Sequence, residues 1–116
     1  MTYSEALNEA ISGWNENPIS DEWVFEKFRE DFVYTMSPSE AFDAIESTIS
    51  VLLHQSDEST AIEVLETLIA LARQSDTTEM PVSLRKSRDE ISGMFSLFGA
   101  YANSKLTELF VFYRCI

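Results

Sequence analysis

The sequence is poor in the residues that most catalytic and metal sites need. It has one histidine, His54, and one cysteine, Cys115, in 116 residues. One residue of each type cannot supply a Cys/His zinc cluster, an HExxH pair or an internal disulfide, and no glycine-rich phosphate loop is present. His54 stands at the expected end of a helix, where an imidazolium interacts favourably with the helix dipole. We therefore expect a protein that is not an enzyme and that uses no metal or cofactor.

Glycine, proline and long apolar runs are also scarce. Three glycines and three prolines leave little turn chemistry for a fold of many strands. No apolar run approaches the ~20 residues that cross a bilayer. The N-terminus has neither a basic start nor a continuous apolar stretch, so we expect no signal peptide. Together with the lone cysteine, which agrees with a reducing compartment, these features predict a cytoplasmic protein that does not bind membranes.

Charge of one sign dominates the chain. The chain has twenty acidic and eight basic residues, which gives a net charge of −12. Residues 1–80 hold 17 acids and three bases, a net −14, while residues 81–116 hold three acids and five bases, a net +2. Such a field repels nucleic acid and anionic membranes and accelerates the encounter with basic proteins. The alternative interpretation is that the negative charge only keeps the protein soluble and does not attract a partner.

Amphipathic spacing predicts helices along nearly the whole chain. The expected helices cover residues 4–14, 20–34, 38–55, 58–74 and 91–113, with the helix over 58–74 the most buried. Their short connections predict one all-α domain over residues 1–116, with five to six helices. Its architecture is either a helical bundle or a short stack of helical hairpins of HEAT-like character.

Local signals mark where some of these helices begin and end. Ser37, Pro38 and Glu40 form a capping-box sequence, and Ser20 is a plausible N-cap for the second helix. The C-terminal pattern stays in one helical phase, but Gly93, Gly99 and the pair 103–104 are points of bending or interruption. The ending LFVFYRCI reads as helix or as a short strand, and we favour helix. This aromatic-rich end is also a candidate dimer interface.

The second helix carries two aromatic residues that its amphipathic pattern does not explain. Its core-facing arc consists of Val24, Phe25, Phe28, Phe32 and Met36. Trp23 and Tyr34 lie with Lys27 on a different flank, beside Glu30 and Asp31. Large aromatics among charges are typical of a protein interface, where they anchor the buried centre. The alternative is that Trp23 and Tyr34 pack against the first helix or the C-terminus.

Acidic residues complete the predicted binding surface. Glu22, Glu26 and Glu30, with Arg29, form a polar stripe on the second helix. Acids of the fourth helix join this stripe if the helices stack as hairpins. The candidate partner-binding residues are therefore Glu22, Trp23, Glu26, Glu30, Asp31, Tyr34, Asp57, Glu58, Glu63 and Glu66.

A small, helical, strongly acidic chain without catalytic apparatus resembles the immunity proteins of bacterial toxin systems, including those of contact-dependent growth inhibition. The resemblance is one of size, charge and helical organisation over the whole chain. It implies that the protein binds a cognate toxin, commonly a basic nuclease, and blocks or deforms its active site. Glu22, Glu26 and Glu30 would then mimic phosphates or pair with basic toxin residues, and Trp23 and Tyr34 would be the anchors.

Two other functions remain open at the level of sequence. One is a helical adaptor or regulatory subunit that binds a partner helix in a groove between its third, fourth and fifth helices. The other is a nucleic-acid mimic that inhibits a DNA-binding protein. Direct binding of nucleic acid is not expected, because the five C-terminal bases are scattered and are outweighed by the field of the first eighty residues.

Overall fold

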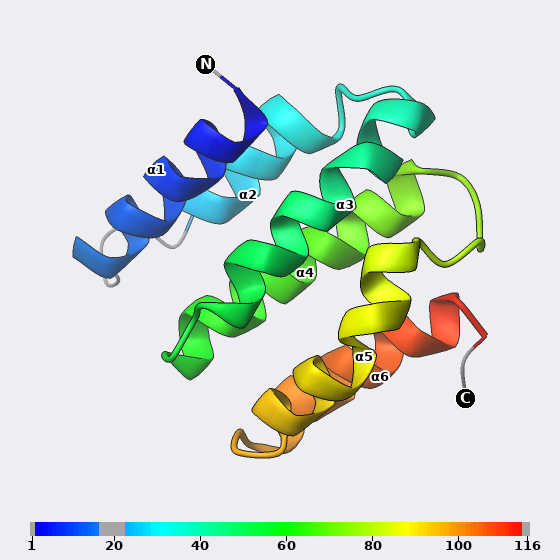
Figure 1. Cartoon of the computed structure of the whole chain (residues 1–116). Coiled ribbons are helices and arrows are strands. Elements are labelled where there is room, and N and C mark those ends of the chain that lie inside the picture. The colour runs from blue at the N-terminus through cyan, green and yellow to red at the C-terminus, as the bar shows by residue number, and fades with distance from the viewer. Residues whose placement is uncertain (1, 17–22, 115–116) are drawn as a thin grey trace.

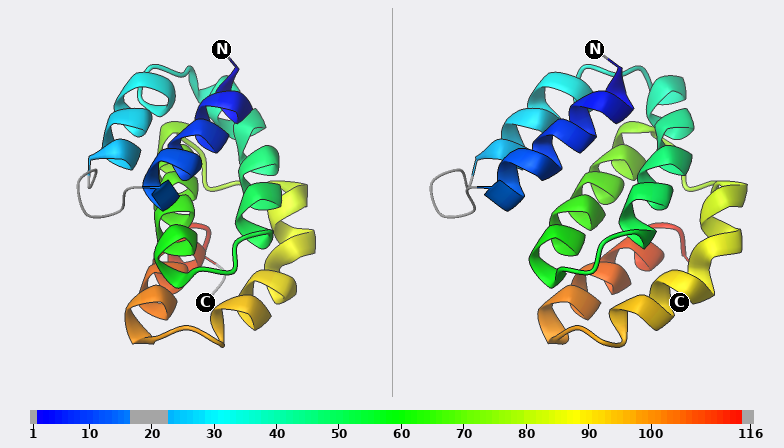
Figure 2. Two further views of the ribbon diagram at one scale, coloured as in Figure 1. Left: turned by 90° about the vertical axis from the view of Figure 1, so that its left-hand side faces the viewer. Right: turned by 60° about the vertical axis from the view of Figure 1, so that its left-hand side comes forward.

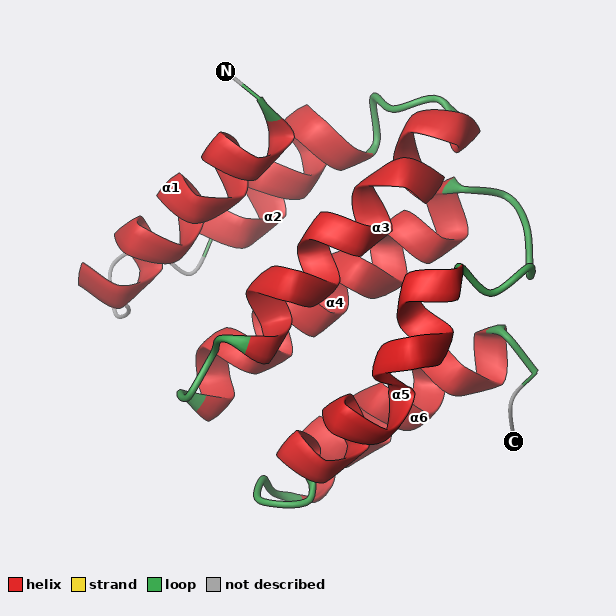
Figure 3. Cartoon of the chain, in the orientation of Figure 1, coloured by secondary structure: helices red, strands yellow, loops and turns green. Residues whose placement is uncertain are grey.

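The protein is helical throughout the part of the chain that the structure describes. This computed structural model describes residues 2–16 and 23–114, and these contain six α-helices, one π-helical turn and no strand (Figure 3). The elements are α1 (Tyr3–Glu16), α2 (Val24–Phe28), the π-helix η1 (Arg29–Val33), α3 (Pro38–Leu53), α4 (Glu58–Gln74), α5 (Val82–Phe95) and α6 (Ala100–Phe112). The all-α prediction is confirmed. No helix among the described residues is long and apolar enough to span a membrane.

The helices of the described chain form three stacked hairpins (Figure 1). α1 pairs with α2, α3 with α4, and α5 with α6. Along the stack α1 contacts α3 and α3 contacts α5, while η1 contacts α4 and α4 contacts α6. The molecule measures 37 × 34 × 18 Å, and its short dimension corresponds to two layers of helices (Figure 2). The middle hairpin therefore has a neighbouring hairpin on each side.

The core is built around α4, as its apolar pattern predicts. This helix buries Thr60, Ala61, Val64, Leu65, Thr67, Leu68, Ile69, Leu71 and Ala72. Its two buried threonines satisfy their hydroxyl groups locally. The Thr67 hydroxyl donates to the Glu63 carbonyl oxygen at 3.0 Å, and the Thr60 hydroxyl donates to the Asp57 carboxylate at 3.0 Å.

The predicted start of α3 is confirmed in detail. The Ser37 hydroxyl accepts from the Glu40 backbone N–H at 3.1 Å, and the Glu40 carboxylate accepts from the Ser37 N–H at 3.0 Å. Pro38 occupies the first turn. His54 is the C-cap residue of this helix, with its Nδ1 atom 2.7 Å from the Ser50 carbonyl oxygen. Both ends of α3 are thus set by local interactions.

The second predicted helix is not a regular α-helix. It changes to a π-helical turn at Arg29–Val33, where the Tyr34 N–H donates to the Arg29 carbonyl oxygen at 2.9 Å. The wider turn rotates the residues that follow it. Val33 is fully buried, although a regular α-helix would place it about 120° from the centre of the apolar arc. The predicted cap Ser20 lies outside the described residues.

The C-terminal region forms two helices rather than one, which corrects the prediction of a continuous helical phase. Of the predicted interruption points, only Gly99 is used, as the N-cap residue of α6, whereas Gly93 and the pair 103–104 lie inside helices. The Asn103 side chain closes the connection by donating to the carbonyl oxygens of Phe95, Phe98 and Gly99. The stretch up to Phe112 is helical, so the strand alternative is wrong for these residues.

Candidate partner-binding surface

A groove between α1 and α2 is the main hollow on the first hairpin. It has a volume of about 390 Å³, and no described residue of α3 to α6 lines it. Its lining consists of Ala6, Glu9, Ala10 and Gly13 from α1, and of Trp23, Val24, Lys27, Phe28, Asp31 and Phe32 from the α2–η1 arm of the same hairpin. We call it the α1/α2 groove. Its floor is apolar, and charged side chains stand at its edges.

Trp23 stands at this groove with most of its surface in solvent. Its side chain is 63% exposed. Trp23, Lys27 and Asp31 follow one another at intervals of four residues, so they form a single row along the groove. Trp14 is the tryptophan that packs inward, with its ring 5.6 Å from that of Phe25. The alternative in which Trp23 packs against the first helix or the C-terminus is therefore not what the structure shows.

Four exposed acids of the first hairpin form no ion pair among the described residues, although Lys27 lines the same groove as two of them. Glu9 and Asp31 line the groove, and Glu26 and Glu30 are exposed on α2 and η1 outside it. Within residues 2–16 and 23–114, none of these four carboxylates takes part in an ion pair. They are therefore available to basic groups from another molecule. Glu22, the remaining acid of the predicted stripe, lies outside the described residues.

Tyr34 is exposed at a different place. Its side chain is 54% exposed and borders a hollow of about 260 Å³ between η1, α4 and α6, where Gln74, Arg73 and Lys105 also lie. Trp23 and Tyr34 stand at opposite ends of the α2–η1 arm and line different hollows. The structure therefore does not bring the two predicted anchors together.

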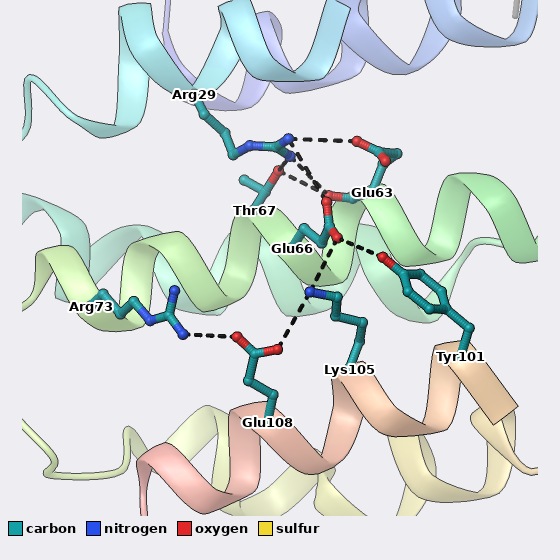
Figure 4. Close-up of polar contacts among 8 residues, drawn as sticks. All are labelled: Arg29, Glu63, Glu66, Thr67, Arg73, Tyr101, Lys105 and Glu108. Carbon is teal, nitrogen blue, oxygen red and sulfur yellow. Dashed lines mark hydrogen bonds and ion pairs between the residues drawn. The ribbon is translucent and has the colours of Figure 1, made fainter. Parts of the chain in front are cut away.

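Arg29 turns toward the core instead of joining the exposed acidic stripe, which corrects its predicted place (Figure 4). Its side chain is 12% exposed, and its Nη2 atom lies 3.6 Å from Glu63 Oε1 and 3.9 Å from Glu66 Oε2. Its Nη1 group donates to the Thr67 hydroxyl at 3.3 Å and to the Glu63 carbonyl oxygen at 3.5 Å. The guanidinium thus ties the first hairpin to α4.

Glu66 extends this contact to the third hairpin. Lys105 Nζ lies 3.6 Å from Glu66 Oε1 and 3.4 Å from Glu108 Oε2, and Glu108 also pairs with Arg73 at 2.8 Å. Burial, followed by the neighbouring Glu66 charge, raises the pKa of Glu63, and Arg29 opposes this increase. Glu63 and Glu66 therefore hold the three hairpins together and do not extend the free acids of the α2–η1 arm.

Asp57 and Glu58 also have partners within the chain. The Asp57 carboxylate caps α4 by accepting from the Thr60 N–H at 2.9 Å. Glu58 Oε2 accepts from the Gly99 N–H at 3.2 Å, which links the start of α4 to the start of α6. All four candidate acids from the α4 region thus make intramolecular contacts, in contrast to Glu26, Glu30 and Asp31.

Sequence reasoning missed the contribution of α1 to the surface. Ala6, Ala10 and Gly13 recur at intervals of four and three residues, which places small side chains in one row. That row is visible in the sequence, from which we predicted only an amphipathic helix over residues 4–14. Which face of α1 stays uncovered depends on how the first hairpin meets α3 and α4.

A third hollow, the α3/α5 hollow, lies between α3 and α5. It has a volume of about 530 Å³, and its apolar lining comes from Ile49, Leu53 and Val82. His54 and Lys86 stand at its polar edge. Val82 is 63% exposed, so part of this apolar surface is open to solvent.

Neither metal-binding geometry among the described residues nor a match to a known protein indicates a site. In the described part of the chain, no group of three or more His, Cys, Asp or Glu side chains is placed to hold a metal ion. No family model, curated protein or solved structure matches the chain. The function is therefore argued from the surfaces described above.

Proposed function

We propose that this protein is an immunity-type inhibitor that acts in the cytoplasm. Its partner in this proposal is a basic protein, a cognate bacterial toxin domain of the nuclease class, whose active site it blocks. The observation that carries the proposal is Trp23, 63% exposed beside carboxylates that have no ion-pair partner among the described residues. An exposed tryptophan supplies a large contact area, and unpaired acids supply attraction for a basic surface.

The charge distribution supports a basic partner in particular. The net −14 of residues 1–80 produces a negative field around the first two hairpins. Such a field accelerates the approach of a basic protein and loses its effect as salt screens it. Glu26 and Glu30, four residues apart on the exposed side, can take the place that phosphates occupy on a basic nuclease.

The experiment begins with affinity capture from the native cell, washed at low and at high salt, with the captured proteins identified by mass. A captured basic protein is then expressed alone and together with this protein. We expect it to arrest growth alone and to be harmless in the presence of this protein. Its association rate should fall steeply as salt rises, because charge steers the encounter.

Trp23→Ala tests the anchor within the same experiment. We expect about a tenfold or greater loss of affinity, as for an interface hot spot. Leu97→Ala is the matched control, because Leu97 is 85% exposed in the α5–α6 connection, away from the groove. A partner that is not toxic, or that binds the Trp23 variant as tightly as the wild type, would contradict the proposal.

A helical adaptor or regulatory subunit is the second candidate function. The α3/α5 hollow, with exposed Val82 beside Ile49 and Leu53, favours it because an apolar strip between helices can receive a partner helix. Binding there should depend little on salt. Val82→Glu would abolish it, whereas Trp23→Ala would leave it unchanged, and these two variants distinguish the two functions.

A further inference from the structure

We infer that the α1/α2 groove receives one amphipathic helix from the partner, with an apolar face toward the groove and Lys or Arg along its flanks. This inference rests on the proposed function and specifies its docking element. In the complex, the partner helix would lie as the next helix of the stack. Three features of the groove lead to this assignment: its position, its small residues and its charged edges.

The groove belongs to the first hairpin, which is one of the two ends of the stack. The middle hairpin lies between the first and the third hairpin (Figure 2). No described residue of α3 to α6 lines the groove of the first hairpin. The other side of α1 is occupied, since the Tyr3 hydroxyl lies 2.6 Å from the Thr48 hydroxyl of α3. End units of helical stacks need polar outer faces to stay unpartnered. This one instead has the partly buried apolar residues Val24 and Phe32 in the lining of its groove.

Small residues on α1 make room for a helix. Ala6, Ala10 and Gly13 form a row along the groove, and such rows let two helix backbones approach closely. Packing within the hairpin does not require glycine at position 13. A Cβ atom added there would lie 3.8 Å from Val24 Cγ2, which is an ordinary van der Waals distance. The contact between α1 and α2 therefore does not require glycine at this position, and the absence of a side chain leaves the groove open there.

The charged edges determine the chemistry of the occupant. Glu9 comes from α1 and Asp31 from η1, so a carboxylate stands on each helical side of the groove, and these two outnumber its one basic residue, Lys27. Basic side chains on both flanks of a docked helix would meet them. A second copy of this chain fits less well, because each copy carries a net charge of −12 and would bring its own Glu9 and Asp31 to the contact.

The test uses two synthetic helical peptides and the full-length protein. One peptide consists of Leu and Lys, with leucines at the i, i+3, i+4, i+7 spacing, and the other replaces each Lys by Glu. Calorimetry measures affinity, and amide NMR shifts locate the contact. We expect the Leu/Lys peptide to bind and to shift α1 and α2 resonances, and the Leu/Glu peptide not to bind.

Gly13→Leu fills the groove and should weaken peptide binding about tenfold or more, the loss typical of blocking an interface centre. Gly93→Leu is the matched control, because Gly93 is exposed on α5 with no atom within 4 Å of an added Cβ. Circular dichroism and thermal unfolding verify that both variants fold. Glu9→Lys, a change at an exposed position, tests the groove independently. This variant should bind the Leu/Lys peptide more weakly, and the Leu/Glu peptide more tightly, than the wild type does.

Several results would overturn the inference. The first is that Gly13→Leu and Glu9→Lys both bind the Leu/Lys peptide with wild-type affinity. The others are that the amide NMR shifts are confined to the α3/α5 hollow, or that the two peptides bind equally well. A concentration-dependent dimer that Gly13→Leu abolishes would assign the groove to a second copy instead. If wild type and Gly13→Leu neutralise the toxin equally, the inference fails and the proposed function stands. If the peptide occupies the groove but no toxin is neutralised, the proposed function fails and the inference stands.

Discussion

Replacing Arg29 by methionine tests whether the contact between the first hairpin and α4 depends on its charge. Methionine is about as long as the methylene part of the arginine side chain. The change removes the guanidinium that lies 3.6 Å from Glu63 and 3.9 Å from Glu66. At about 4 Å, one such pair has a gross attraction of about 4 kcal/mol at an effective dielectric constant near 20. The cost of desolvating Arg29, and water that reaches the two glutamates, offset part of this attraction. We therefore expect a net loss of about 2–3 kcal/mol.

The loss of stability in Arg29→Met should depend on pH, because the variant retains the Glu63 carboxyl group without its basic partner. Burial already raises the pKa of Glu63 above its ordinary value of 4.5, and removing Arg29 raises that pKa further. A carboxyl group whose pKa is raised on folding favours the folded state below its unfolded pKa, and this contribution disappears as the pH rises through the folded pKa. The Arg29→Met penalty should therefore be largest at neutral pH and should shrink as the pH falls toward 4.5.

Urea unfolding at a series of pH values measures this difference, and thermal unfolding should show a decrease in Tm of roughly 10 °C at pH 7. Arg73→Met is the matched control. Its pair with Glu108 is shorter, at 2.8 Å, but Arg73 is 63% exposed, so the expected loss is only about 0.5 kcal/mol. Equal losses in the two variants, or a pH-independent loss in Arg29→Met, would refute the assignment of Arg29 as a partly buried tie.

Two further predictions concern stability. Ser37→Ala removes the acceptor for the Glu40 N–H and should cost about 1 kcal/mol in urea unfolding, whereas Ser39→Ala, an exposed change in the same turn, should cost much less. Burial raises the pKa of Tyr3 to about 12, so its stabilising contribution is complete below 10.0 and declines as the pH rises toward 12. Tyr3→Phe should reduce the alkaline loss of stability, and an undiminished loss in this variant would contradict the role of Tyr3.

The candidate surface could be predicted only in part from the sequence. Helical periodicity separates Trp23 from the core-facing residues of its own helix, and Trp23 is exposed in the structure. The same reasoning grouped Tyr34 with Trp23 and placed Arg29 on the exposed stripe. The π-helical turn at Arg29–Val33 changes the phase of this segment, and the sequence contains no local signal for it. An angular position on one helix also does not say which neighbouring helix will cover it.

The acids show the same division between local and long-range information. Glu40 and Asp57 act at helix starts, and the capping box of Glu40 was predictable because its partner Ser37 lies three residues away. Glu63 and Glu66 meet Arg29 and Lys105 from other hairpins, at separations of more than thirty residues. Whether an acid is a free binding group or an internal tie therefore depended on packing between hairpins.

The sequence by itself determined the all-α class, the extent of α4, the capped start of α3 and the acidity of the first eighty residues. These properties depend on hydrogen bonds between near neighbours, on side-chain spacing along one helix and on composition. The tertiary structure alone decided that the chain stacks as three hairpins, that Trp23 and Tyr34 line separate hollows, and that Ala10 and Gly13 open a groove beside Trp23. Those outcomes depend on which helix faces meet, because packing between distant segments determines which apolar and charged groups remain exposed to solvent.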